Sequence, residues 1–184
     1  MGKYIYLIVG ESGSGKSWIV DRLTILGLTA IQSYTTRPPR YPGETGHIFV
    51  DKMPEDMADV VAYTHFDGND YWATTQQVEE NDLYVVDPAG VTYFLRHYDG
   101  TKRPIVFYVD TTEKTRRKRM KKRGDKRQDI RRRIQHDRTM FGVQAYDCLM
   151  YIIPNDDGLG VFRIEDRIRE LEESDGDNPI ENPV

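Results

Sequence analysis

The sequence predicts an α/β protein with three α/β/α layers, in which a mostly parallel sheet carries helices on both faces and a small β-rich lobe and a helical lid are attached. Strand and helix patterns alternate along the chain, which is typical of parallel sheets built from crossover units. The expected central strands are continuous apolar runs, as in sheets that are covered on both faces. A glycine-rich turn separates the first strand from the first helix.

The first expected strand spans residues 3–9, a short run rich in Ile, Val and Tyr. Apolar residues then recur at helical spacing over residues 17–26, and Gly27 is the expected helix stop. Residues 28–33 form the second expected strand. The segment that follows, through Gly46, is polar and proline-rich and continues neither a helix nor a strand pattern.

The β-rich lobe is expected between residues 48 and 75. Strands are predicted over residues 48–50 and 60–66, and the Asp-Gly-Asn-Asp sequence at 67–70 has the chemistry of a turn. Further strands are expected at 83–87, 105–110 and 149–153, and further helices at 88–97, 113–123, 129–141 and 161–172. Together these elements predict one domain over residues 1–173. It comprises a core (1–33, 81–112 and 139–173), the lobe (34–80) and the lid (113–138), followed by a disordered tail at 174–184.

Composition points to a globular protein of the cytoplasm. The chain has 184 residues, 38% of them hydrophobic, and a formal net charge of -4, so it is not built as a whole to coat nucleic acid. Cys148 is the single cysteine, which excludes an internal disulfide and fits a reducing compartment. The first ten residues lack a signal-peptide layout, and no apolar run reaches about 18 residues. We expect a cytoplasmic monomer or homodimer without a membrane span.

The most specific motif is Gly10-Glu11-Ser12-Gly13-Ser14-Gly15-Lys16-Ser17, which fits G-x-x-x-x-G-K-[ST] and follows an apolar strand. Glycines let backbone N–H groups turn around phosphate oxygens, and the following helix N-terminus favours negative charge. Lys16 is expected to reach the β and γ phosphates of ATP, and the Ser17 hydroxyl to hold Mg²⁺. The motif predicts a P-loop NTPase fold with ATP and Mg²⁺, but it does not specify the reaction.

Positive charge is concentrated in residues 113–138, which carry fourteen Lys or Arg against four Asp or Glu in an otherwise acidic chain. Such a segment can neutralise phosphates and close over them as a lid. A solvated basic helix pair and a nucleic-acid-binding patch are the alternatives. Aromatic residues that could stack on bases are absent from this segment, which makes nucleic acid unfavoured.

A second phosphate-binding segment is suggested by Ser33-Tyr34-Thr35-Thr36-Arg37-Pro38-Pro39-Arg40, because arginine forks bind phosphate with two hydrogen bonds. This segment, followed by Gly43-Glu44, resembles the T-T-R-x-P-R-x-G-E segment of the guanylate kinase family. Further matches cover about residues 4–170 in consistent order: Phe49-Val50, Phe66-x-Gly68-Asn69-x-Tyr71, Arg123-Gly124 and Asn155-Asp156-Asp157.

The resemblance implies a role for each matching position. Ser33, Arg37, Arg40 and Tyr71 would bind the phosphate of the acceptor nucleotide. Lys16, Arg123 and Arg133 would neutralise the group in transfer, Asp87 would lie near the metal and the acceptor, and Asn155 near the adenine of ATP. His47 aligns with a second phosphate-binding tyrosine of the family, and an imidazole can also donate to a phosphate.

The resemblance fails at the base of the acceptor. The family reads guanine with a glutamate in the lobe strand and a serine that follows the G-N-x-Y tyrosine, and the matching residues are Ala62 and Ala73. Losing a buried hydrogen-bond partner costs about 1–3 kcal/mol. Either Thr64, His65, Thr74 or Thr75 reads the base instead, or the acceptor is not GMP.

Three functions follow from these patterns. The first is an ATP-dependent nucleoside monophosphate kinase, with GMP or dGMP as acceptor or, alternatively, another deoxynucleotide, a modified nucleotide or a ribose bisphosphate. The second is a non-catalytic interaction module of guanylate-kinase-like fold, which the intact phosphate loop and arginines disfavour. The third, a nucleic-acid-binding protein, is disfavoured by the acidic remainder of the chain.

Overall fold

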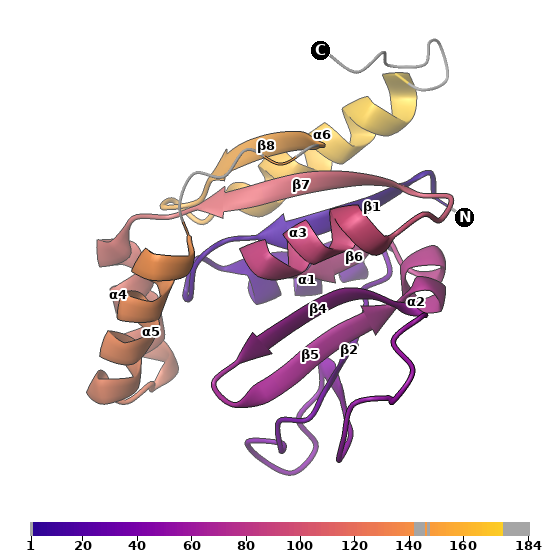
Figure 1. The fold of residues 1–184 in the computed structure, drawn as a ribbon. Coiled ribbons are helices and arrows are strands. Elements are labelled where there is room, and N and C mark those ends of the chain that lie inside the picture. Colours follow the sequence, from indigo (N-terminus) through magenta and orange to yellow (C-terminus); the bar gives the residue numbers. More distant parts are fainter. Residues whose placement is uncertain (1, 142–145, 147, 175–184) are drawn as a thin grey trace.

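A parallel four-stranded sheet forms the centre of the molecule (Figure 1). The computed structural model describes residues 2–141, 146 and 148–174. The strands lie in the order β6 (Leu83–Val85), β1 (Tyr4–Val9), β7 (Arg103–Asp110) and β8 (Leu149–Pro154), and every neighbouring pair is parallel. In the described residues, no helix is both long enough and apolar enough to cross a membrane.

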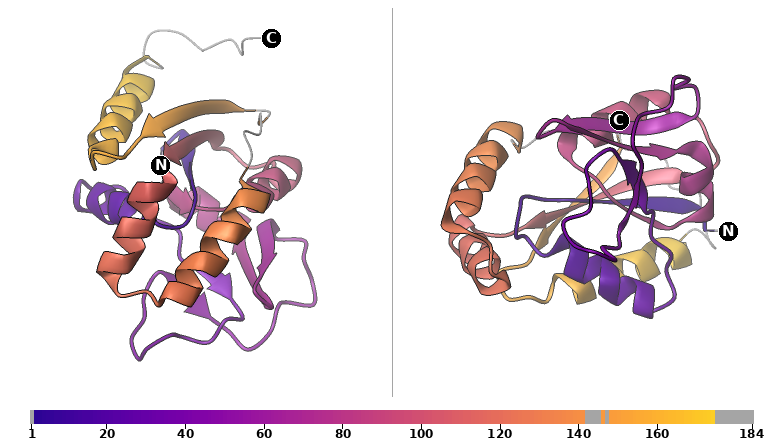
Figure 2. Two further views of the ribbon diagram at one scale, coloured as in Figure 1. Left: turned by 90° about the vertical axis from the view of Figure 1, so that its left-hand side faces the viewer. Right: turned by 90° about the horizontal axis from the view of Figure 1, so that it is seen from below.

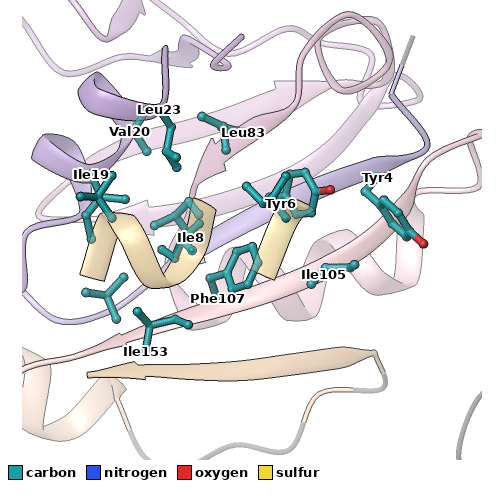
Figure 3. Packing of buried hydrophobic residues seen from close by; sticks show 14 of the residues in the cluster. Tyr4, Tyr6, Ile8, Ile19, Val20, Leu23, Leu83, Ile105, Phe107 and Ile153 are labelled. Carbon is teal, nitrogen blue, oxygen red and sulfur yellow. The ribbon is translucent and has the colours of Figure 1, made fainter. Parts of the chain in front are cut away.

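Helices cover both faces of this central sheet. On one face α1 (Lys16–Ile25) and α6 (Gly160–Ser174) pack against alternate residues of β1 such as Tyr6 and Ile8 (Figure 3). On the other face α3 (Pro88–His97) packs against the residues between them, including Leu7. Because successive strand residues point to opposite faces, the continuous apolar run of β1 serves two cores.

A second sheet lies beside the central one and contains β3 (His47–Phe49), β2 (Ser33–Thr35), β5 (Asn69–Thr74) and β4 (Val60–Phe66), in this order. It is mixed, because β2 pairs with β3 in parallel and β5 pairs with both β2 and β4 antiparallel. The β4–β5 hairpin turns at Asp67 and Gly68, both of which have positive φ.

The short helix α2 (Thr75–Glu80) follows β5 and begins with a capping box between Thr74 and Gln77. Strand β4 packs directly against α3, and one apolar cluster contains residues of both sheets and of α3. The second sheet therefore shares its core with the central sheet.

The basic helix pair, α4 (Glu113–Arg123) and α5 (Arg127–Met140), stands beyond the carboxyl end of β7 (Figures 1 and 2). Gly124 ends α4 with a φ of 96°, which favours glycine at this C-cap. Met120, Ile130 and Ile134 form a small apolar cluster between the two helices. This cluster explains how a segment with so many cations still folds into two packed helices.

The predicted fold class is confirmed, and three details differ from expectation. Residues 28–33 are not a strand: Ala30 forms one isolated bridge with Leu83, and Ser33 already belongs to the second sheet, because the chain crosses here from one sheet to the other. Strand β5 and helix α2 were not predicted. Helix α6 includes Ser174, the first residue of the predicted tail, and residues 175–184 of that tail lie outside the described part.

Candidate functional site

The phosphate loop, residues 10–17, connects the end of β1 to the start of α1. Gly13 and Gly15 have φ angles of 79° and 107°, which L side chains rarely adopt. A Cβ atom on Gly13 would lie 2.9 Å from the carbonyl oxygen of Arg116, and one on Gly15 would lie 2.8 Å from the Asn155 amide nitrogen. Side chains at these two positions would collide with α4 and with Asn155, which explains why glycines stand here.

Lys16 lies folded against this loop. Its Nζ donates to the carbonyl oxygen of Gly10 and, at 3.1 Å, to that of Glu11. Burial lowers the pKa of Lys16 to about 8, although the nearby carboxylates of Asp137 and Glu11 act in the opposite direction. The ammonium form still predominates at pH 7, as phosphate binding requires.

A buried carboxylate of the basic helix pair contacts the phosphate loop. Asp137 of α5, only 3% exposed, accepts hydrogen bonds from the backbone N–H of Ser12 at 3.0 Å and from the Ser12 hydroxyl at 3.1 Å. Arg116 of α4 donates to Asp137 at 2.8 Å and pairs with Glu11 at 3.3 Å. The loop is thus tied to both helices through one network. Sequence reasoning missed Asp137 and Arg116, since nothing in the charge pattern separates them from their solvated neighbours.

Asn155, at the end of β8, lies against the outer side of the loop. Its amide nitrogen donates to the Ser14 carbonyl at 2.8 Å, and its amide oxygen accepts from the Gly160 backbone at 2.9 Å. Arg119 donates to the carbonyls of Ser14 and Asn155. With Gly15, Trp18 and Gly158, both residues line a cavity of about 260 Å³, here called the side cavity.

The cations expected to act in transfer surround one larger cavity of about 670 Å³, here called the phosphate cavity. Lys16 and Ser17 reach it from the phosphate loop, Arg40 from the segment after β2, and Arg123 and Arg133 from the basic helix pair. Burial lowers the pKa of Arg40, and Arg37 and Arg133 lower it further. Crowded cations of this kind predict a site for an anion.

Arg37 and Arg40 are both held by Glu44. Arg37 forms two hydrogen bonds with the Glu44 carboxylate, at 2.9 and 3.1 Å, while Arg40 donates to it from its backbone at 2.6 Å. The hydrogen bond from Arg37 lowers the pKa of Glu44 to about 2. The Arg37 side chain is 11% exposed and that of Arg40 is 57% exposed. Arg37 is therefore braced, and Arg40 is the more accessible of the two.

Ser33, His47 and Tyr71 meet in a second cavity of about 220 Å³, here called the inner cavity. The Ser33 hydroxyl lies 2.9 Å from Nδ1 of His47, and the His47 ring lies 5.7 Å from that of Tyr71. Burial lowers the pKa of His47, and so does the nearby charge of Arg37, so the neutral imidazole is favoured. Lys16, Asp87 and Arg133 line the same cavity, which joins it to the phosphate loop.

Asp87 caps helix α3 and faces the inner cavity. One carboxylate oxygen accepts from the Gly90 backbone at 2.7 Å, and the other accepts from the Thr64 hydroxyl at 2.8 Å. The carboxylate is thereby held between α3 and β4. In the described residues, no group of three or more His, Cys, Asp or Glu side chains is arranged to hold a metal ion.

Ala62 and Ala73, which the resemblance aligns with the guanine-reading residues, face each other across β4 and β5 and are fully buried. Both belong to the apolar cluster with Val91 and Phe94 of α3, and neither lines the inner cavity. Trp72 is also buried, where it stacks on Tyr34. The inner cavity is bordered instead by Tyr63, Thr64, Phe66 and Tyr84.

Comparison with known proteins reveals similarity to guanylate kinases. No model of a known protein family matches the chain. It is 25% identical over 170 residues to a guanylate kinase of Porphyromonas gingivalis (83% of this chain, 89% of the relative). It is 27% identical over 167 residues to one of Nitrosomonas europaea (82% and 81%).

A solved structure supports the same relationship at the level of the fold. The crystal structure of guanylate kinase from Anaplasma phagocytophilum matches with a TM-score of 0.55 and 18% identity, covering 97% of this chain and 89% of that one. The sequence and the fold thus agree along most of the chain, and both support the predicted resemblance to the guanylate kinase family.

Proposed function

We propose that this protein transfers the terminal phosphoryl group of ATP to the phosphate of a nucleoside monophosphate. The observation that carries the proposal is the phosphate cavity, where the phosphate loop, Arg40 and the arginines of the basic helix pair converge. Phosphoryl transfer depends on alignment and charge neutralisation more than on covalent chemistry. A cavity that gathers cations from two sides is suited to holding two phosphorylated molecules end to end.

On the donor side, the loop backbone and Lys16 would bind the β and γ phosphates of ATP. The Ser17 hydroxyl also lines the phosphate cavity, and a hydroxyl oxygen is a ligand type that Mg²⁺ accepts together with phosphate oxygens and water. Bound there, Mg²⁺ would supply charge neutralisation between the phosphates. The nucleoside part of ATP would lie toward Asn155.

On the acceptor side, Arg40 and Tyr71 would hold the acceptor phosphate together with the Ser33–His47 pair. Glu44 already neutralises the charge of Arg37. Arg37 would therefore contribute partly by holding its segment in place and only partly by its charge. Asp87, which lines the inner cavity, would orient the acceptor near the metal. Arg123 and Arg133 would neutralise the group in transfer from the basic helix pair, which would serve as a lid.

GMP and dGMP are the first acceptors to test, since the curated relatives are named guanylate kinases. One observation favours a second candidate, the same reaction on an acceptor without guanine. Ala62 and Ala73 lie in an apolar core and offer no partner to a guanine edge. Another deoxynucleotide, a modified nucleotide or a ribose bisphosphate remains compatible with the phosphate-binding residues. In each case we expect a soluble substrate of the cytoplasm rather than a membrane or nucleic acid.

An ADP-release assay over a panel of nucleoside monophosphates, deoxynucleotides and sugar phosphates tests the proposal. We expect turnover with at least one acceptor and its loss by a factor of about 10³ or more in Lys16→Ala, with the thermal melt unchanged. Turnover with GMP alone would restore the guanine interpretation. Absence of turnover with every acceptor, or normal activity of Lys16→Ala, would contradict the proposal and favour a non-catalytic module.

A further inference from the structure

We propose that Trp18 forms the wall on which the base of the donor nucleotide stacks. The protein would recognise this base by stacking on its ring face rather than by hydrogen bonds to its edge. The proposal rests on the proposed function, because it assumes that a nucleoside triphosphate binds the phosphate loop. It adds a specificity-determining residue and predicts that ATP is one of several acceptable donors.

The first support is the position of the side cavity. It shares Gly15, Trp18 and Arg119 with the phosphate cavity, so the two cavities adjoin at the start of α1. A nucleotide whose terminal phosphates lie on the loop must place its sugar and base nearby. The side cavity, at about 260 Å³, lies on the side of Gly15 where Asn155 marks the end of β8.

The second support is that the polar side chains of the side cavity are already engaged by the protein. Both amide atoms of Asn155, a residue only 2% exposed, are bonded to the backbone of Ser14 and Gly160. Both terminal nitrogens of Arg119 donate to backbone carbonyls. These groups hold the phosphate loop in place, so they are poorly suited to distinguishing the edge of one base from that of another.

The third support is Trp18 itself. It occupies the first turn of α1, where its side chain lies 47% exposed at the rim of both cavities. The guanidinium of Arg22, one turn further along the helix, lies 5.6 Å from the centre of the indole ring and restrains it. Indole is the largest flat surface that a side chain can offer, and stacking tolerates any base because every base has a π face.

Tryptophan fluorescence gives a direct test of binding. The chain has two tryptophans, and Trp72 is buried against Tyr34, so Trp72→Phe leaves Trp18 as the single tryptophan, which is excited selectively at the red edge of the absorption band. We expect MgATP to quench this emission strongly, and Mg-tripolyphosphate, which has the phosphates without the base, to change it little. Equal responses to both ligands, or no response to MgATP from a protein that still turns over, would overturn the assignment.

Kinetics provide a second test that does not depend on the Trp72 variant. In Trp18→Leu we expect the KM for ATP to rise about tenfold, because stacking on one aromatic ring is worth roughly that factor. The kcat should stay within about twofold, and the inhibition constant of tripolyphosphate should not change. Phe162→Leu is the matched control, since Phe162 is 57% exposed on α6 and lines none of these cavities.

Donor selectivity completes the design. Reading by the face predicts that GTP, CTP and UTP support turnover within about tenfold of ATP in kcat/KM. A preference for ATP above about a hundredfold, or an unchanged KM in Trp18→Leu, would refute the proposal while leaving the phosphoryl-transfer function intact. Failure of the proposed phosphoryl-transfer function is recognised by a separate result. If that function is wrong, Lys16→Ala binds MgATP as well as the parent protein does.

Discussion

The proposed donor and acceptor sides of the site depend on the sequence in different ways. The phosphate loop works mainly through its backbone, and glycines with positive φ set its shape. The proposed acceptor side would work through side chains that come from separate strands, namely Ser33, His47 and Tyr71. The first can be recognised from one short motif. The acceptor side depends on several separate residues, so its phosphate-binding residues can be present when the residues that would recognise the base are absent.

On the proposed assignment, phosphate binding and base recognition would be separable in one fold. The arginines and the loop surround the phosphate cavity, whereas Ala62 and Ala73 belong to the apolar core shared with α3. A glutamate or serine would have to be solvated or paired there, and an alanine needs neither. The second sheet can therefore pack closely on α3 at the position where the family reads guanine.

The largest effect is expected from an arginine that serves both sides. Arg133 lines the inner and phosphate cavities, and its Nε is buried without a hydrogen-bond partner among the described residues. We expect Arg133→Ala to lower kcat by about 10³, since an arginine on the transferring phosphoryl group contributes this much. The neighbouring Arg132, 60% exposed and paired with Asp67, is the matched control and should change kcat about twofold. Similar losses in both variants, measured by steady-state kinetics, would contradict the assignment.

A large loss of stability is expected when a charge is returned to the base-reading position. Ala62 is fully buried, so Ala62→Glu should lower the free energy of unfolding by about 3 kcal/mol without creating a preference for GMP. Ala58→Glu, at an exposed position of the same segment, should change it by less than about 0.5 kcal/mol. Urea unfolding measures both. A stable Ala62→Glu variant that prefers GMP would show that the guanine position is open in solution.

A smaller effect is expected from Arg40, the exposed member of the Arg37–Arg40 pair held by Glu44, here called the arginine clamp. Arg40→Ala should raise the acceptor KM about tenfold and slow transfer, because one charge-assisted contact to phosphate is lost while Arg37 and Glu44 remain paired. The KM for ATP should change less than that for the acceptor. Arg96→Ala, an exposed arginine on α3, serves as the control. An unchanged acceptor KM and kcat would remove Arg40 from the site.

Much of the fold could be predicted because its signals are local. The apolar runs of β1 and β7 and the motif at residues 10–17 each specify one structure without reference to the rest of the chain. Strand β5 was missed because half of its residues Asn69–Thr74 are polar, and its pairing with β2 depends on distant contacts. The turn at residues 67–70 was read correctly, but its second strand was not.

The site was harder to predict where it depends on which charge is buried. Asp137 and Asp129 look alike in sequence, yet only Asp137 is turned toward the phosphate loop, where Arg116 and Ser12 satisfy it. Helical periodicity places Asp137 on the same face as Ile130 and Ile134, and that spacing was the available signal. The engagement of Asn155 by the backbone has no sequence signal, since it depends on the fold around Ser14.

The smallest effect is expected at the carboxylate that braces the clamp, and it depends on pH. The pKa of Glu44 is lowered to about 2, so its ionised form stabilises the folded state above the unfolded pKa of about 4.3, and this contribution is lost as the pH falls toward 2. Glu44→Gln should therefore be about 1 kcal/mol less stable than the parent at pH 7, and the two should converge at pH 2. Urea unfolding over this pH series measures the difference. The control Glu55→Gln, which removes a 93% exposed carboxylate, should have the same stability as the parent at every pH. If the stability curve of Glu44→Gln against pH ran parallel to that of the parent, the ion pair with Arg37 would contribute no pH-dependent stability.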